Sequence, residues 1–259
     1  MFSQTIALIR YQLLGLVNLR LCLLLACFAG LGVLAGQFIG ELALINSERI
    51  AQAAVADLMR YCVVILMLVL VNYQVAQDYE LQFFDRLLAM PVDRYQYVLA
   101  QFCVIAVLSC LLVMPIALVL LLNNAGQSGY WTLAVYIELL LVGQIATLVA
   151  VSLEKLVVAL IASLAFYLFA KTLPLIQLAL NQSAAFYPEE AGFHFSQWFY
   201  SAVQTIMPPM HAFAQNNLMF VSDGSIAALG RQLIVVLVYS LFVQAIVLAD
   251  FYRKELNRT

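Results

Sequence analysis

Long apolar segments alternate with shorter polar ones along almost the entire chain. A helix that crosses the hydrocarbon core of a bilayer needs about 20 predominantly apolar residues. Six segments meet this requirement: residues 21–40, 59–76, 97–122, 131–153, 156–175 and 232–251. The pattern therefore predicts an all-α, polytopic membrane protein with six transmembrane helices. Only Glu154 and Lys155 separate the fourth segment from the fifth, which predicts a tight helical hairpin there.

The residues before the first predicted span have an amphipathic pattern. Their apolar side chains recur at helical spacing, at Phe2, Ile6, Ile9, Leu13 and Leu16. Such a stripe, with polar residues beside it, is typical of a helix that lies in the membrane interface. We therefore predict an interfacial helix over residues 1–20. The alternative is that these residues extend the first transmembrane helix.

Residues 177–230, between the fifth and sixth predicted spans, form a long stretch rich in aromatic side chains. Two apolar runs within it, 198–207 and 210–221, are too short to span a bilayer. Pro208 and Pro209 separate the two runs, because proline blocks the continuation of a helix. We predict a short extracytoplasmic helical hairpin that is re-entrant or interfacial. A small cap packed on the spans is the alternative.

The composition supports an integral membrane protein. The 259 residues are 65% hydrophobic and 10% charged, whereas soluble domains are about 45–50% apolar and about 25% charged. We interpret residues 1–259 as a single transmembrane domain. A net charge of −2 argues against a nucleic-acid partner. The five cysteines lie inside apolar runs, without the spacing of a metal site or a disulfide framework.

Basic residues predict the orientation of the chain, since cytoplasmic loops carry an excess of Lys and Arg. With six spans, both termini lie on one side. Eight of the twelve basic residues fall on that side: Arg10, Arg20, Arg86, Arg94, Lys155, Arg253, Lys254 and Arg258. The other four fall on the opposite side: Arg49, Arg60, Lys171 and Arg231. Both termini are therefore predicted to be cytoplasmic.

The most polar long segment in the first two-thirds of the chain lies between the second and third predicted spans. It carries six charged residues: Asp78, Glu80, Asp85, Arg86, Asp93 and Arg94. A helix-forming run over 78–90 ends at Pro91, and a second run begins near Asp93, a favourable N-cap. We predict a short cytoplasmic helix over residues 78–95 that meets a soluble partner. A helix that only lies among lipid headgroups is the alternative.

Taken in order, these features resemble the permease subunit of type-2 ABC transporters over nearly the whole chain. In that family an acidic stretch, a Leu-rich turn and a Pro-Val-polar-basic run precede the third span. Here residues 78–80 read Asp-Tyr-Glu, and residues 87–94 read Leu-Leu-Ala-Met-Pro-Val-Asp-Arg. Residues 207–213, Met-Pro-Pro-Met-His-Ala-Phe, look like the Pro-centred motif before the final span, and Phe-Tyr-Arg-Lys at 251–254 looks like the family's ending. The chain lacks the basic member of the family's usual Glu-basic-acidic run.

The resemblance implies a permease that forms a translocation path as a homodimer or heterodimer in a prokaryotic-type cytoplasmic (inner) membrane, with export as the expected direction. The chain has no Gly-x-x-x-x-Gly-Lys-Ser/Thr motif. We therefore expect a separate cytoplasmic ABC ATPase to bind ATP, and no cofactor or catalytic residue on this chain. The residues implied to couple to the ATPase are Asp78, Glu80, Phe83, Phe84, Asp85, Arg86, Leu87, Leu88, Pro91 and Arg94.

Glu138 and Lys171 are the ionisable residues deepest in the predicted spans. Charge inside a membrane is costly and usually paired or functional. Both residues fall in the outer half of a predicted hairpin, which favours a structural ion pair, and a substrate path or snorkelling toward water are the alternatives. His194 and His211 have too few partner ligands to predict a metal site.

Two other classes of function remain open at this point. A membrane scaffold or assembly factor requires no ATPase on residues 78–94. A lipid-modifying membrane enzyme requires a catalytic residue such as Glu138, His194 or His211. A secondary transporter is disfavoured, because its helices are more polar and broken near the midplane.

Overall fold

The protein is described by a computed structural model, which covers residues 2–16, scattered positions between 25 and 41, and residues 47–80, 94–122, 128–184, 191–213 and 225–256. Every regular element in these ranges is helical. The elements are α1 (Phe2–Leu16), α3 (Ser47–Glu80), α5 (Arg94–Leu122), α6 (Ser128–Leu153), α7 (Leu156–Ala184), α8 (Ala191–Ile206), the 3-10 turn η1 (Met210–Ala212) and α10 (Ser225–Leu256).

Five helices in the described ranges are long and apolar enough to cross a membrane. They cover Ala53–Glu80, Tyr95–Leu121, Gly129–Leu153, Leu156–Gln182 and Leu229–Asp250. These helices confirm the predicted all-α, multi-pass integral membrane protein. They correspond to the second to sixth spans predicted from hydropathy. Half of the first predicted span, 21–40, lies outside the described residues, so the number six stays a prediction.

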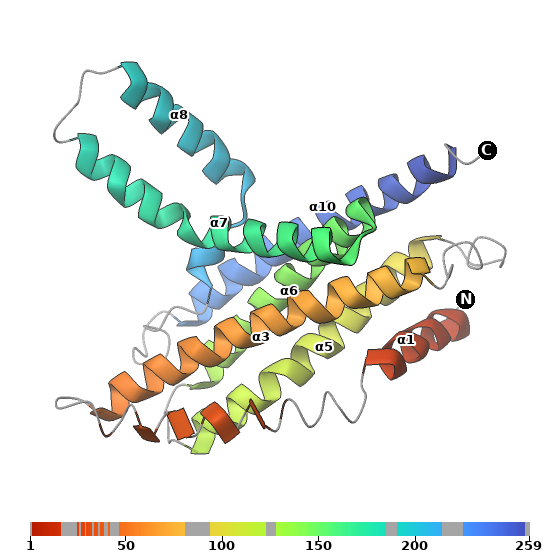
Figure 1. Ribbon diagram of the computed structural model, residues 1–259, viewed down its shortest axis with the longest axis horizontal. Coiled ribbons are helices and arrows are strands. Elements are labelled where there is room, and N and C mark those ends of the chain that lie inside the picture. The colour runs from red at the N-terminus through yellow and green to blue at the C-terminus, as the bar shows by residue number, and fades with distance from the viewer. Residues whose placement is uncertain are drawn as a thin grey trace.

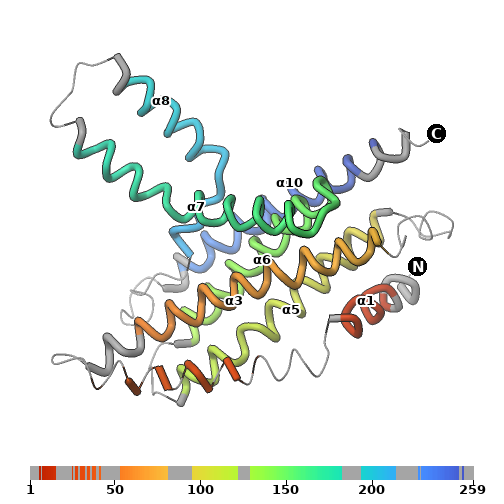
Figure 2. The backbone as a smooth tube through the Cα atoms, in the orientation of Figure 1, coloured from red at the N-terminus to blue at the C-terminus, as the bar shows by residue number. Residues whose placement is uncertain are grey.

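The bundle is built around α6, which packs against α3, α5, α7 and α10. These helices run side by side, and α1 packs along α5 near one end of the bundle (Figure 1). The end of α3, the start of α5, the α6–α7 turn, α1 and the C-terminal end of α10 all lie at that same end (Figures 1 and 2). We call it the termini end; the opposite end carries η1 and the start of α3.

The link between α6 and α7 is as short as predicted. Glu154 and Lys155 alone join the two helices. Glu154 adopts a left-handed backbone conformation, with φ of 57°, and its N–H still donates to the Ala150 carbonyl at 3.0 Å. One residue in this conformation turns the chain sharply enough for the next helix to return.

All five spanning helices extend beyond the apolar segments predicted from hydropathy, α3 and α7 among them. No glycine or proline interrupts the chain between Ser47 and Glu80, and α3 runs unbroken through both polar flanks of its span. Asp78 and Glu80 are therefore the last turn of α3, and not the start of a separate helix over 78–90. The helix α7 continues past the predicted end at residue 175 to Ala184. It contains Pro174 and bends along its length (Figure 2), as expected where proline removes a backbone hydrogen bond.

The segment between α7 and α10 differs in detail from the predicted hairpin. The first apolar run forms α8, which starts at Ala191 and packs mainly against α7. The hydroxyl of Tyr239 on α10 also donates to the carbonyl of Ile206, the last residue of α8, at 3.2 Å. After the break at Pro208 and Pro209, the second run forms no more than the three-residue turn η1 in the described residues. Residues 214–221 of that run lie outside them. The C-terminal part of α7 and the helix α8 project together from the bundle (Figure 1).

Close packing at the centre of the bundle depends on Gly143 of α6. A Cβ at this position would lie 2.5 Å from Met67 Cε on α3 and 2.6 Å from Ile105 Cγ2 on α5. The methionine end can move, but the branched isoleucine is held in the buried core. Glycine at 143 therefore lets three helices approach closely.

We expect Gly143→Ala to destabilise the protein by about 1–3 kcal/mol, because the added methyl overpacks the core. Thermal unfolding in detergent, followed by intrinsic fluorescence, measures the change. Gly230→Ala is the matched control, since nothing lies within 4 Å of a Cβ placed there on α10. Equal melting temperatures for the two variants would show that the close approach at Gly143 is not a constraint.

Candidate functional site

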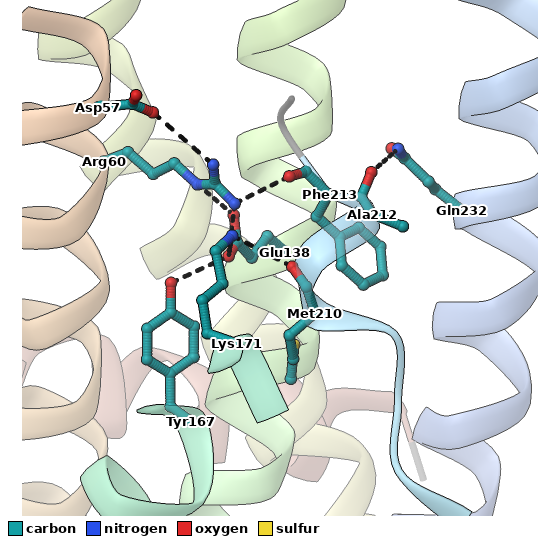
Figure 3. A network of polar contacts seen from close by, with 9 residues as sticks. All are labelled: Asp57, Arg60, Glu138, Tyr167, Lys171, Met210, Ala212, Phe213 and Gln232. Atoms are coloured by element: carbon teal, nitrogen blue, oxygen red, sulfur yellow. Dashed lines mark hydrogen bonds and ion pairs between the residues drawn. The ribbon is translucent and has the colours of Figure 1, made fainter. Parts of the chain in front are cut away.

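A cluster of acidic and basic side chains lies inside the bundle, centred on the buried Glu138 of α6. Arg60 of α3 binds the carboxylate with two hydrogen bonds, Nε to Oε2 at 2.7 Å and Nη2 to Oε1 at 3.0 Å. The hydroxyl of Tyr167 on α7 donates to the same Oε1 at 3.1 Å. Glu138 is fully buried and Arg60 is only 3% exposed. Figure 3 shows the three side chains converging from three helices.

Two further charges complete the cluster. Lys171 Nζ on α7 lies 3.7 Å from Glu138 Oε1, and Asp57 Oδ1, one turn before Arg60 on α3, lies 3.9 Å from Arg60 Nη1. The cluster thus contains two acidic and two basic groups and has no net charge. Neutrality matters because an uncompensated charge in a low-dielectric interior costs several kcal/mol.

The same basic groups hold the irregular segment 207–213. Lys171 Nζ donates to the Met210 carbonyl at 3.2 Å, and Arg60 Nη2 donates to the Phe213 carbonyl at 2.8 Å. Gln232 of α10 donates to the Ala212 carbonyl at 2.7 Å. Non-helical backbone at membrane depth is tolerated only where protein or water satisfies its polar groups. The cluster therefore anchors the chain that follows the Pro208–Pro209 break (Figure 3).

The structure brings Glu138 and Lys171 together, as the predicted pair requires, but Arg60 is the closer partner of Glu138. Sequence reasoning assigned Arg60 only to the outer side and overlooked Tyr167 and Gln232. The sequence did give an indication for Arg60, because it is the second residue of the predicted span 59–76. An arginine inside a spanning segment needs a partner for its charge. Tyr167 precedes Lys171 by four residues, which places both on one helix face.

The residues implied to couple to an ATPase are only partly described. Asp78 is 5% exposed and accepts a hydrogen bond from Tyr97 of α5 at 3.1 Å. Its side chain therefore points into the protein and presents little surface to a soluble partner. Glu80 is exposed at the end of α3, and Arg94 is the first residue of α5. The remaining residues lie outside the described ranges: Phe83, Phe84, Asp85, Arg86, Leu87, Leu88 and Pro91.

The histidines do not converge on a site. His194 is exposed on α8, whereas His211 lies in η1, beside the charge cluster. Among the described residues, no group of three or more His, Cys, Asp or Glu side chains is placed to hold a metal ion.

The geometry of Glu138 suits a structural role, in which it holds helices together, better than a role in proton transfer. Each carboxylate oxygen accepts a hydrogen bond from Arg60, and one of them also faces Tyr167 and Lys171. These donors occupy both oxygens of a fully buried carboxylate, so Glu138 has no open position toward a substrate. The cluster is therefore a clamp that joins α3, α6, α7 and segment 207–213.

Comparisons of the chain with protein-family models, curated proteins and solved structures find no match.

We expect Arg60→Met to destabilise the protein by about 3–5 kcal/mol, because it leaves Glu138 buried without its main partner. Adding Glu138→Met should cost less than the sum of the two single changes, by about 1–3 kcal/mol, since the unpaired charge is gone. Unfolding in mixed micelles measures all three variants. Arg231→Met is the control, because this arginine is exposed at the start of α10 and surface changes cost little. Strict additivity would contradict a direct pair.

Burial lowers the pKa of the His211 imidazole below its ordinary value, and the positive charge of Lys171 lowers it further. The unfolded chain then binds a proton more readily than the folded one near and below pH 6.5. We therefore expect stability to be retained above this pH and lost as the pH falls through it. Between pH 7 and pH 5, the melting temperature of the wild type should fall by more than that of the His211→Gln variant. Parallel profiles would rule out His211 as a contributor.

Proposed function

We propose that the chain is the membrane-spanning permease subunit of an ATP-driven transporter of the type-2 ABC class, with ATP hydrolysis on separate cytoplasmic subunits. One observation carries the proposal. The end of α3 at Glu80 and the start of α5 at Arg94, which the polar residues 81–93 connect in sequence, lie at the bundle end that also holds both termini (Figure 1). This is the position from which a surface segment meets a soluble partner and connects it directly to two spanning helices.

The charge distribution supports the orientation in this proposal. Arg10, Lys155 and Arg253 are exposed on elements of the termini end, and an excess of basic residues is typical of the cytoplasmic side. We therefore place both termini in the cytoplasm of a prokaryotic-type inner membrane. The opposite end, with segment 207–213, then faces outward, and the expected direction is export.

The proposed docking surface consists of Phe83, Phe84, Leu87 and Leu88, with Asp85 and Arg86 at its rim and Glu80 and Arg94 flanking it. Aromatic and aliphatic anchors carry most of the energy of an interface, and rim charges set orientation and encounter rate. Asp78 has a different role in this scheme. The hydrogen bond that it accepts from Tyr97 links the last turn of α3 to α5. A displacement of either helix at this end would therefore also move the other.

The unbroken helix α3 supplies a physical route from this segment to the charge cluster. Glu80 follows Arg60 by twenty residues on one helix, which corresponds to about 30 Å at 1.5 Å per residue. In the proposed mechanism, ATPase closure displaces the termini end of α3. Arg60 then shifts against Glu138 and loosens its hold on the Phe213 carbonyl, which opens the outer end of the translocation path in the permease dimer.

The surface of α8 favours an amphipathic cargo. Phe195, Trp198 and Phe199 are exposed on this helix, and their rings are neighbours, with centroids 6.1 Å apart for Phe195–Trp198 and 6.5 Å for Phe195–Phe199. Tryptophan side chains such as Trp198 concentrate at the membrane interface. A molecule with apolar and polar parts that leaves the outer end would meet this surface first.

To test the proposal, we would co-express this chain with a P-loop ATPase encoded beside it, purify by a tag on this chain, and measure ATP hydrolysis in lipid. Copurification with hydrolysis is expected for the wild type. Phe84→Asp combined with Leu88→Asp should lower both at least tenfold, because two buried anchors are lost. Gln82→Asp, which adds a charge at a polar position of the same segment, should leave both near wild type.

The melting temperature of each variant separates loss of docking from loss of folding. A wild-type chain that is well folded and binds no ATPase would overturn the transporter proposal and favour a scaffold or assembly factor. Turnover of a lipid without ATP, abolished by a change at His194 or His211, would favour a membrane enzyme.

A further inference from the structure

A small polar cavity lies between α1 and α3 at the termini end of the bundle, far along α3 from the charge cluster. Its volume is about 280 Å³. The helix α1 contributes Tyr11, Gln12 and Gly15, and α3 contributes Gln74, Gln77 and Asp78. Leu14 completes the lining. The charge cluster does not use this cavity, and the proposed coupling to an ATPase uses only one of its residues, Asp78, through the hydrogen bond from Tyr97.

The cavity contains buried amides that lack partners among the described residues. Gln12 is 3% exposed, and neither its Nε2 nor its Oε1 makes a hydrogen bond there. Gln74 is also buried; its Nε2 reaches Gln101 Oε1 at a long 3.4 Å, while its own Oε1 and the Gln101 Nε2 stay unsatisfied. Buried polar groups in proteins are nearly always paired. These amides therefore point to a bound molecule with both donors and acceptors.

The negative charge of Asp78 in the cavity indicates that the bound molecule places a cationic group there. The Asp78 carboxylate accepts one hydrogen bond, from Tyr97, and no basic side chain described in the structure lies within ion-pair distance of it. Asp78 also lies in the last turn of α3, where the helix dipole places partial negative charge and favours a cation. A primary ammonium group fits, because it supplies both the charge and three N–H donors.

The surroundings of the cavity indicate a lipid rather than a free amine. Ile6, Tyr11 and Leu14 expose large apolar surface on α1, a helix that packs beside the spanning helix α5. An outward apolar face of this kind is typical of a helix at the membrane interface. Tyr11 and Leu14 line the cavity from this exposed face, so an acyl chain can pass out along α1 into the bilayer.

We propose that this cavity binds the headgroup of an aminophospholipid, whose ammonium group meets Asp78 and Gln74 and whose phosphate accepts from the amide of Gln12. A free phosphoethanolamine has the same chemistry but no acyl chain to occupy the exposed face of α1. The proposal is independent of the transport function, since it rests only on the side chains that line the cavity.

The test uses the purified full chain in mixed micelles with equal amounts of phosphatidylethanolamine and phosphatidylcholine of identical acyl chains. Native mass spectrometry counts the lipids that remain bound. The wild type should retain the ethanolamine lipid at least about tenfold over the choline lipid, because a quaternary ammonium has no N–H to donate and loses its charge-assisted hydrogen bonds.

Two variants address the proposed contacts. Asp78→Asn removes the charge with little change of shape, and Gln12→Leu removes the amide of α1; each should reduce the preference to threefold or less. Glu80→Gln is the matched control, because it removes one charge from the same end of α3 at an exposed position outside the cavity. If Asp78→Asn does not fold, Gln12→Leu and the wild-type comparison still decide.

Equal retention of the two lipids by the wild type would overturn the proposal, since the protein would then not distinguish a primary ammonium from a quaternary one. An undiminished preference in both variants would place the lipid elsewhere on the protein. Water-soluble glycerophosphoethanolamine distinguishes the source of the headgroup. It should raise the melting temperature far less than the lipid does, and an equal rise would show that the site takes a free small molecule instead.

Discussion

Arg60 and Glu138 form a bidentate ion pair in the interior of the bundle. The packing of the helices and of segment 207–213 at the end opposite the termini depends on this pair. The pair joins α3 to α6, while Tyr167 and Lys171 bring in α7 through the same carboxylate. The hydrogen bonds that remain available to Arg60 and Lys171 then hold carbonyls of segment 207–213. Apolar packing alone leaves helices free to slide in lipid, because lipid tails compete equally well for apolar surface. Directional bonds between charged groups remove that freedom.

The two ends of α3 are polar in different ways. Near Arg60 every charge has an opposite partner, and irregular backbone is satisfied by side chains, so this end holds its shape without a ligand. Near Asp78 the amide of Gln12 and the Oε1 of Gln74 lack partners in the described residues, and no basic side chain described in the structure balances the negative charge of Asp78. A compensated cluster at one end and an uncompensated cavity at the other are joined by one continuous helix. Any molecule or protein that acts on the termini end therefore acts on a helix whose far end carries Arg60.

The hydropathy of the sequence was sufficient to predict the spanning helices, and the described residues confirm five of them. Each transmembrane helix satisfies its own backbone, so its existence depends on local composition. The two-residue link at Glu154 and Lys155 could also be read from the chain. The ends of helices were less accurate. The predicted break before Asp78 did not occur, because polarity alone does not stop a helix that contains no glycine or proline.

The sequence by itself thus determined the fold class, the apolar segments and the rarity of intramembrane charge, since all three follow from residues close together in the chain. It also indicated that Glu138 needs a partner. Only the tertiary structure decided that the partner is chiefly Arg60, which lies 78 residues away on another helix, and that Asp78 faces Tyr97 and not solvent. Pairing of this kind depends on how helices rotate and cross. That geometry is set by side-chain packing such as the close approach at Gly143, and it leaves no periodic signal in the sequence.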